Sequence, residues 1–138
     1  MTSTNRDLIR RADGVLRPVQ AGDRYFGDVA STLVTAGGNF YDGVCIDTGA
    51  SGFCAERAAI AAMVTAGEYR ISRIVAVWRE WQGGRGELCV MPPCGVCRQF
   101  MLLVDRGNLD ADVVLGPDES VKLRELLPRT DWPPPTKL

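Results

Sequence analysis

The sequence predicts a single α/β domain over residues 1–138. Apolar segments of strand length, rich in Val, Ile and Leu, alternate with segments whose apolar residues recur every three or four positions. Turns that contain Gly or Pro separate these segments. A chain of this length can bury about two thirds of its unfolded surface, so one hydrophobic core is enough to stabilise it.

The first half of the chain is predicted to contain two helices with a hairpin between them. Residues 4–16 have the apolar spacing of an amphipathic helix, whereas residues 28–35 and 40–46 have the composition of strands. The Gly-Gly-Asn turn at residues 37–39 joins these strands. An Ala-rich run over residues 55–66 is the strongest helical pattern in the sequence.

The second half is predicted to add three strands and one helix. The strands are expected at residues 71–77, 88–91 and 113–115. Two prolines precede Cys94, where a helix over residues 94–103 should begin, because proline restricts the backbone at a helix start. The chain therefore offers five strands in all.

Composition limits the classes of partner that we expect. Sixteen Lys and Arg against seventeen Asp and Glu give a net charge of −1. We therefore do not expect binding to duplex nucleic acid or to an anionic membrane, which requires an excess of positive charge. The N-terminal residues form no apolar segment, and no apolar run approaches the ~20 residues that span a bilayer. A cytoplasmic protein is expected. Five cysteines, an odd number, suggest metal binding more than disulfides.

Three of these cysteines have the spacing of a zinc site. Cys54 precedes the Ala-rich helix, and Cys94 and Cys97 form a C-x-x-C pair at the start of the next helix. Helix N-termini favour the thiolate form that binds metal. Three sulfur ligands and no histidine fit a catalytic zinc with one open position. The alternatives are a closed structural zinc or thiols without metal, although a four-sulfur site usually has two C-x-x-C pairs.

Glu56 lies two residues after the first of these cysteines. At this distance its carboxylate can take a proton from water that the metal activates, so we interpret Glu56 as a general base. The alternative is a charge that only stabilises the helix start.

The segments Cys54-Ala55-Glu56 and Pro93-Cys94-Gly95-Val96-Cys97 resemble the signature of zinc-dependent cytidine deaminases. The resemblance, to the cytidine deaminase and blasticidin-S deaminase branch, covers roughly residues 25–128. It implies a three-layer α/β/α fold with a mixed five-stranded sheet. It also implies one Zn²⁺ per chain on Cys54, Cys94 and Cys97, and hydrolytic loss of ammonia from a pyrimidine nucleoside with Glu56 as the proton shuttle. Residues 120–127 resemble the last helix of that family.

The same resemblance implies further site residues. An arginine at the place of Arg57 hydrogen-bonds the thiolates in similar enzymes, and Arg98 is a second candidate for this role. Both could instead be solvated surface residues. Substrate contacts are expected from Ala55 and Pro93, and from Phe26 unless it belongs to the core.

The residues expected to bind the sugar depart from the family pattern. Cytidine deaminases have N-x-E after the second strand, where this chain has Cys45-Ile46-Asp47. Asp47 can still accept a hydroxyl hydrogen bond, but Cys45 replaces asparagine poorly and could be only a small buried residue. The substrate therefore stays open between cytidine, deoxycytidine, a modified analogue and a nucleoside antibiotic such as blasticidin S.

Two other classes of function are weaker interpretations. An RNA- or DNA-editing deaminase would need a basic and aromatic stripe, which we do not find. A zinc-stabilised module without catalysis would not need Glu56.

A homotetramer is expected from the resemblance and from the apolar segment at residues 96–104. Trp132 lies in a proline-rich tail, from which it could cover its own site or that of a neighbouring subunit. The resemblance further implies a role in pyrimidine salvage.

Overall fold

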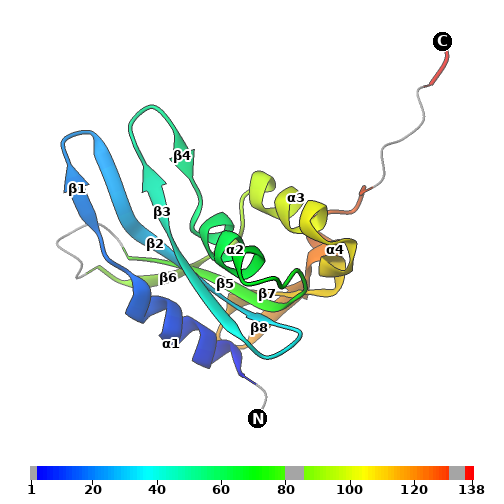
Figure 1. Ribbon diagram of the computed structural model, residues 1–138, viewed down its shortest axis with the longest axis horizontal. Coiled ribbons are helices and arrows are strands. Elements are labelled where there is room, and N and C mark those ends of the chain that lie inside the picture. Colours follow the sequence, from blue (N-terminus) through cyan, green and yellow to red (C-terminus); the bar gives the residue numbers. More distant parts are fainter. Residues whose placement is uncertain (1–2, 80–85, 131–135) are drawn as a thin grey trace.

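A computed structural model of the chain describes residues 3–79, 86–130 and 136–138. Its centre is an eight-stranded sheet in which β4, β3, β2, β5, β7 and β8 are neighbours in that order (Figure 1). The other two of the eight strands lie beside this row: β1 pairs with β2, and β6 pairs with β5. The strands are β1 (Val19–Ala21), β2 (Arg24–Thr35), β3 (Phe40–Asp47), β4 (Gly52–Phe53), β5 (Ile71–Arg79), β6 (Leu88–Met91), β7 (Asp112–Gly116) and β8 (Glu119–Lys122).

The sheet is mixed, as the resemblance to cytidine deaminases implies. Its long central strands β2, β3 and β5 are antiparallel, whereas β5 and β7 are parallel. All five expected strands are present, but the prediction of five was wrong as a total. The additional strands β1, β4 and β8 have only three, two and four residues. Segments this short show no periodicity in the sequence. They are strands because they form hydrogen bonds with neighbouring strands.

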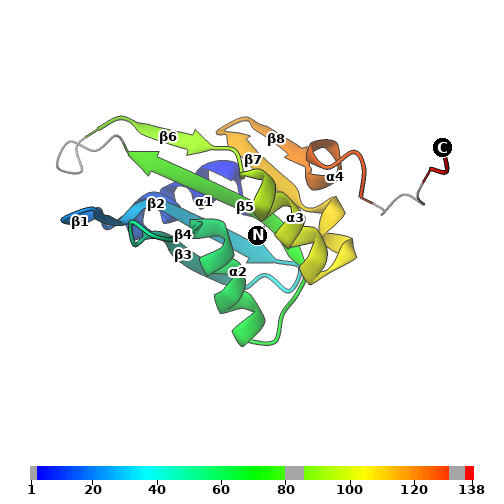
Figure 2. The same ribbon diagram turned by 90° about the horizontal axis from the view of Figure 1, so that it is seen from above.

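Helices cover both faces of the sheet, which gives the three-layer arrangement (Figure 2). On one face α1 (Asn5–Val15) buries Leu8 and Ala12 against Ala30, Val75 and Val77. On the other face α2 (Ala55–Thr65) and α3 (Gly95–Val104) pack in a second core cluster. This cluster contains Leu33, Ile60, Met63, Ile74, Met101 and Val113.

The end of the chain differs from the expected helix over residues 120–127. Residues up to Lys122 belong to β8, which pairs with β7, and α4 spans only Leu123–Leu126. The fully buried side chain of Leu123 docks this short helix on the core beside α2 and α3. A short 3₁₀ helix, η1 (Arg106–Asp110), connects α3 to β7.

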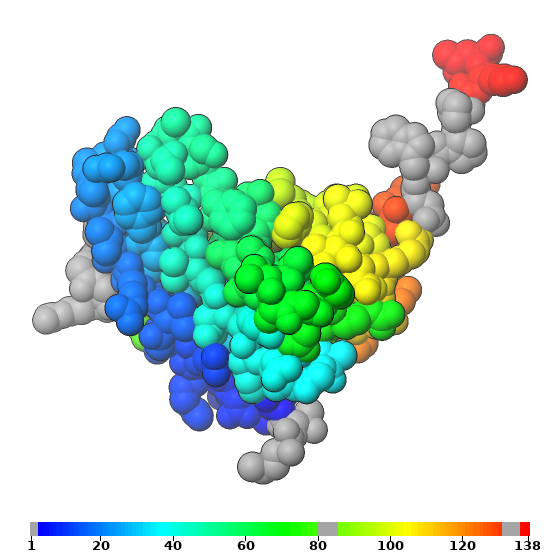
Figure 3. Space-filling view, in the orientation of Figure 1, coloured from blue at the N-terminus to red at the C-terminus, as the bar shows by residue number. Residues whose placement is uncertain are grey.

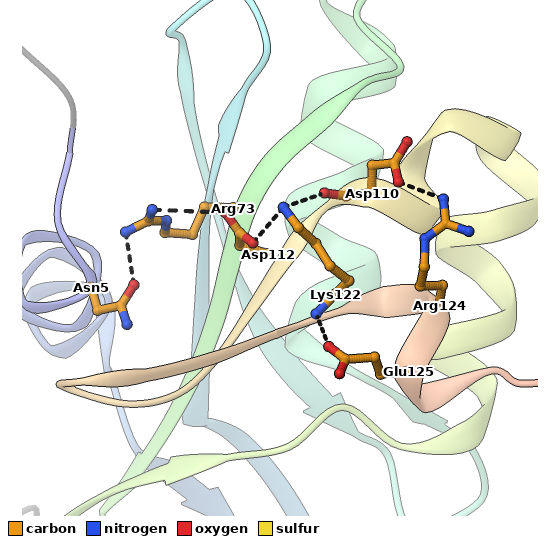
Figure 4. Close-up of polar contacts among 7 residues, drawn as sticks. All are labelled: Asn5, Arg73, Asp110, Asp112, Lys122, Arg124 and Glu125. Carbon is orange, nitrogen blue, oxygen red and sulfur yellow. Dashed lines mark hydrogen bonds and ion pairs between the residues drawn. The ribbon is translucent and has the colours of Figure 1, made fainter.

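A chain of polar contacts ties α1 to the C-terminal strands (Figure 4). Asn5 accepts a hydrogen bond from Arg73, and Arg73 forms an ion pair with Asp112. Lys122 also pairs with Asp112, at 2.8 Å.

No helix in the described parts of the chain is long and apolar enough to cross a membrane.

Candidate metal and substrate site

The predicted cysteines come together where α2 and α3 begin. Cys54 is the N-cap residue of α2, and Cys94 is the N-cap residue of α3. The Sγ atom of Cys94 lies 3.6 Å from that of Cys54 and 3.6 Å from that of Cys97. All three sulfur atoms lie within 4.8 Å of one another. The two segments, 40 residues apart in the sequence, thus form one thiol cluster.

This cluster has the dimensions of a zinc site. Zn–S bonds of about 2.3 Å in tetrahedral geometry separate two sulfur ligands by about 3.7 Å. No fourth candidate ligand joins the cluster among the described residues. Cys89, which lies closest to the C-x-x-C pair in sequence, contacts the Glu87 carbonyl instead, at 3.8 Å. The donor set therefore fits a zinc ion with one position left open.

The electrostatics of the cluster also suit a cation. Burial and the nearby charge of Glu56 raise the pKa of the Cys97 thiol. Burial alone would also raise the pKa of Cys94, but hydrogen bonds from backbone N–H groups and neighbouring thiols lower it overall. Three thiolates this close repel one another, and a bound divalent ion removes this cost.

Gly43 allows α2 to approach the sheet closely at this site. A Cβ atom at this position would lie 2.3 Å from the backbone nitrogen of Ala59 in α2. The glycine thus fixes the distance between β3 and the helix that begins at Cys54. The end of β3 that carries Cys45 and the end of α2 that follows Cys54 are held together in this way.

Glu56 lies in the first turn of α2, and only 6% of its surface is exposed. Burial raises the pKa of its carboxyl group, although a hydrogen bond with Cys97 opposes the shift. The carboxyl group lines a pocket of about 180 Å³ with Ala55, Cys54 and Cys94. A carboxyl group in this position can act as both acceptor and donor of a proton.

The two arginines make other contacts than those expected. Arg57 lies over the ring of Phe53 at 4.6 Å and reaches the Gly52 carbonyl at 3.5 Å. Its Nε atom is buried without a hydrogen-bond partner in the described structure, so one donor is available beside the cluster. Arg98 donates to the Pro93 carbonyl at 2.9 Å and to the Leu126 carbonyl at 3.4 Å. Arg98 thus holds the segment that carries Cys94.

A larger groove of about 740 Å³ adjoins the thiol cluster at the ends of β2, β3 and β4. Cys45 and Cys54 line both this groove and the pocket that contains Glu56, so the two spaces are neighbours. In the space-filling view the ends of β1–β2 and β3–β4 project at the upper left of the molecule (Figure 3). The groove is lined by Tyr25, Asp28, Cys45, Ile46, Asp47, Gly49, Ala50, Ser51, Gly52, Phe53 and Cys54.

Four of the remaining predicted substrate contacts line one of these spaces. Cys45 and Asp47 line the groove, Ala55 lines the pocket, and Pro93 lines a small adjoining space with Glu56. Phe26 lines none of these spaces. Its neighbours Tyr25 and Asp28 line the groove.

The prediction for Trp132 lies outside the described residues. Asp28 was not predicted as a site residue, since its position at the start of an expected strand gives no signal of a site.

No known protein-family model matches the sequence. Three solved structures of cytidine deaminases have similar folds. The enzyme from Burkholderia pseudomallei gives a TM-score of 0.69 at 24% identity over 91% of this chain and 98% of that chain. The enzyme from Bacillus anthracis gives 0.71 at 21% identity over 90% and 86%. That from Mycobacterium tuberculosis gives 0.64 at 24% identity over 91% of each chain. The chain therefore has the cytidine deaminase fold.

Proposed function

We propose that the protein is a zinc-dependent hydrolase that deaminates a small amino-pyrimidine nucleoside. One observation carries this proposal: a buried carboxyl group, Glu56, lies beside a cluster of three thiols at the end of an open groove. This arrangement supplies a metal with an open position, a proton carrier and space for a substrate. The shared fold with enzymes named cytidine deaminases supports the same reaction.

The proposed reaction exchanges an amino group for oxygen at C4 of the ring. Zinc on Cys54, Cys94 and Cys97 would lower the pKa of water and make it a nucleophile near neutral pH. Glu56 would accept a proton from this water and deliver it to N3 as the C–O bond forms. Glu56 would then pass the remaining proton of the hydroxyl group on C4 to the amino nitrogen. The C–N bond would break as the C4 carbonyl forms, and ammonia would leave.

The surrounding residues would keep this carboxyl group in place. Ala55 lines the pocket in which the ring would lie, whereas Pro93 and Glu56 line a second, smaller space. The free Nε–H of Arg57 could donate to a thiolate once the metal is bound, whereas Arg98 would act by holding the Pro93 carbonyl.

Glu56→Gln tests the proposal directly. The amide cannot carry the proton, so turnover should fall by at least about 10²- to 10⁴-fold, while folding and zinc content stay unchanged. Glu119→Gln, a change on an exposed residue of β8, is the matched control. Ammonia release from cytidine, deoxycytidine, blasticidin S and a single-stranded oligonucleotide would be measured. More than a tenth of wild-type activity in Glu56→Gln would remove this residue from the mechanism.

We also propose a homotetramer in the cytoplasm with a role in pyrimidine salvage. Support for assembly comes from α3, whose Val96 and Leu103 are 58% and 72% exposed although they are apolar. Light scattering at micromolar concentration tests this proposal, since a fully active monomer would contradict it. Deletion of residues 130–138 would test whether Trp132 contributes to catalysis.

A further inference from the structure

The strand β2 contains a bulge beside the groove. Phe26 pairs with Ile46 and Ala30 pairs with Val44, so residues 27–29 of β2 lie opposite the single residue Cys45 of β3. Gly27 has a φ of +71°, and a Cβ atom there would lie 2.3 Å from the Arg17 carbonyl oxygen. Only glycine fits this position, and its own carbonyl accepts a 2.9 Å hydrogen bond from the Arg17 N–H. The bulge is therefore fixed by the backbone.

The bulge brings Asp28 to Cys45. The Cys45 thiol donates to Asp28 Oδ1 at 2.8 Å, and Cys45 Sγ accepts the Val29 N–H at 3.4 Å. The thiol has only one proton to donate, so it has no donor left for a substrate. The Asp28 carboxylate, in contrast, keeps further lone pairs and lines the groove. Bulges next to active sites commonly re-aim a side chain in this manner.

Among the described residues, the groove lining includes Asp28 and Asp47 but no Lys or Arg. Arg57 lies at its edge, over the Phe53 ring and beside the Gly52 carbonyl. Neither aspartate forms an ion pair within the described residues, whereas Asp7, Asp13, Asp42, Asp105, Asp110, Asp112 and Asp118 all do. Each aspartate already accepts one hydrogen bond, but Asp47 is exposed to solvent whereas Asp28 is half-buried beside Cys45. Asp28 is thus the acceptor best placed to bind a group of the substrate.

Resting on the deaminase function proposed above, we infer that Asp28 determines substrate specificity and that Cys45 positions it. Asp28 accepts a hydrogen bond from a hydroxyl or protonated amine on the part of the nucleoside remote from the reacting ring. Cys45 does not contact the substrate but orients the carboxylate through its thiol. The same charges disfavour an anionic substituent, so a nucleoside is preferred over its 5′-phosphate.

Variants of both residues test this inference in the zinc-loaded protein. Asp28→Asn should raise KM for cytidine by about 10- to 100-fold with little change in kcat, because it removes an interaction made equally before and during reaction. The effect should shrink for 2′,3′-dideoxycytidine if the donor is the 2′- or 3′-hydroxyl, because this compound keeps only the 5′-hydroxyl. It should grow for 5′-amino-5′-deoxycytidine if the preferred donor is an amine. Cytidine 5′-phosphate should be the poorest substrate of the wild type.

Cys45→Val and Cys45→Ser separate positioning from packing. Valine removes the donor and should raise KM, whereas serine keeps a donor and should restore the wild-type value. Cys89→Ser is the matched control, since this thiol on β6 lines neither the groove nor the pocket. Equal KM values for wild type and Asp28→Asn, or for the valine and serine variants, would overturn the inference.

Calorimetric binding of uridine, the deaminated product of cytidine, provides a readout that needs no turnover. A weaker dissociation constant in Asp28→Asn supports the inference even if the wild type deaminates none of the compounds. In that case the proposed deaminase would fail while the binding role of Asp28 stands. Unchanged uridine binding, or no binding to the wild type, would contradict the role of Asp28.

Discussion

Two regions of the molecule use carboxylates in opposite ways. At the C-terminal strands, Asp112 lies between Arg73 and Lys122, and Asp110 pairs with Arg124 (Figure 4). At the groove, Asp28 has a neutral thiol as its partner and Asp47 has a backbone N–H. The first arrangement neutralises each charge within the fold. The second leaves acceptors for a molecule from outside.

On the proposed function, this difference separates charges that stabilise the fold from charges that bind a ligand. An ion pair at the surface adds up to about 1 kcal/mol to stability and selects no ligand. A carboxylate without a cation, held in place beside a reaction site, can bind a donor at little entropic cost. Substitutions in the two regions should therefore change different measured quantities.

The largest effect is expected at the thiol cluster. Cys97→Ser replaces a fully buried ligand with a poor one, so zinc content and turnover should both fall to near zero. Metal analysis after dialysis, together with ammonia release, would measure this. Treatment of the wild type with a chelator should have the same effect, and added zinc should reverse it. A variant that kept one zinc per chain at unchanged affinity would contradict the assignment of this ligand.

A smaller effect is expected in the C-terminal network. Asp112→Asn removes the partner of Arg73 and Lys122, and the free energy of unfolding should fall by about 0.5 to 1 kcal/mol. Urea titration would measure it, with Asp118→Asn as the control because Asp118 forms only an exposed pair with Arg6. The KM for cytidine should not change. An altered KM in Asp112→Asn would contradict the proposed difference in role between Asp112 and Asp28.

The smallest effect is expected for the pH dependence of stability at Glu68. This residue contacts the end of β2, the following turn and the start of β3. Hydrogen bonds from Tyr41, Thr35 and Asn39 lower the pKa of Glu68 from its usual value of 4.5. A lowered pKa in the folded state adds stability above pH 4.5, and this contribution is lost as pH falls through the folded-state pKa. The stability difference between wild type and Glu68→Gln should thus be present at pH 7 and shrink below pH ~4.5.

Urea titrations of both proteins between pH 7 and pH 3 would measure this change. The hydrogen bond to Glu68 also raises the pKa of Tyr41, so the phenol should titrate at lower pH in Glu68→Gln. A stability difference that is constant with pH would show that Glu68 gains nothing from its ionised form.

The sequence alone determined the mixed α/β class, the long strands and helices, and the thiol cluster with Glu56. These features have local causes. Strand composition, helical spacing, and cysteines at two helix starts are all visible within short windows. The cluster follows because Cys54 and Cys94 both cap helices that pack on the same face of the sheet.

Only the tertiary structure decided the short strands, the end of the chain and the groove. β1, β4 and β8 exist because longer neighbours supply their hydrogen bonds, and β8 forms where residues 120–122 were expected to be helical. The meeting of Asp28 and Cys45 depends on a bulge that needs both Gly27 and the Arg17 backbone. Contacts of this kind join residues that share no periodicity or motif, so they arise only once the strands have paired.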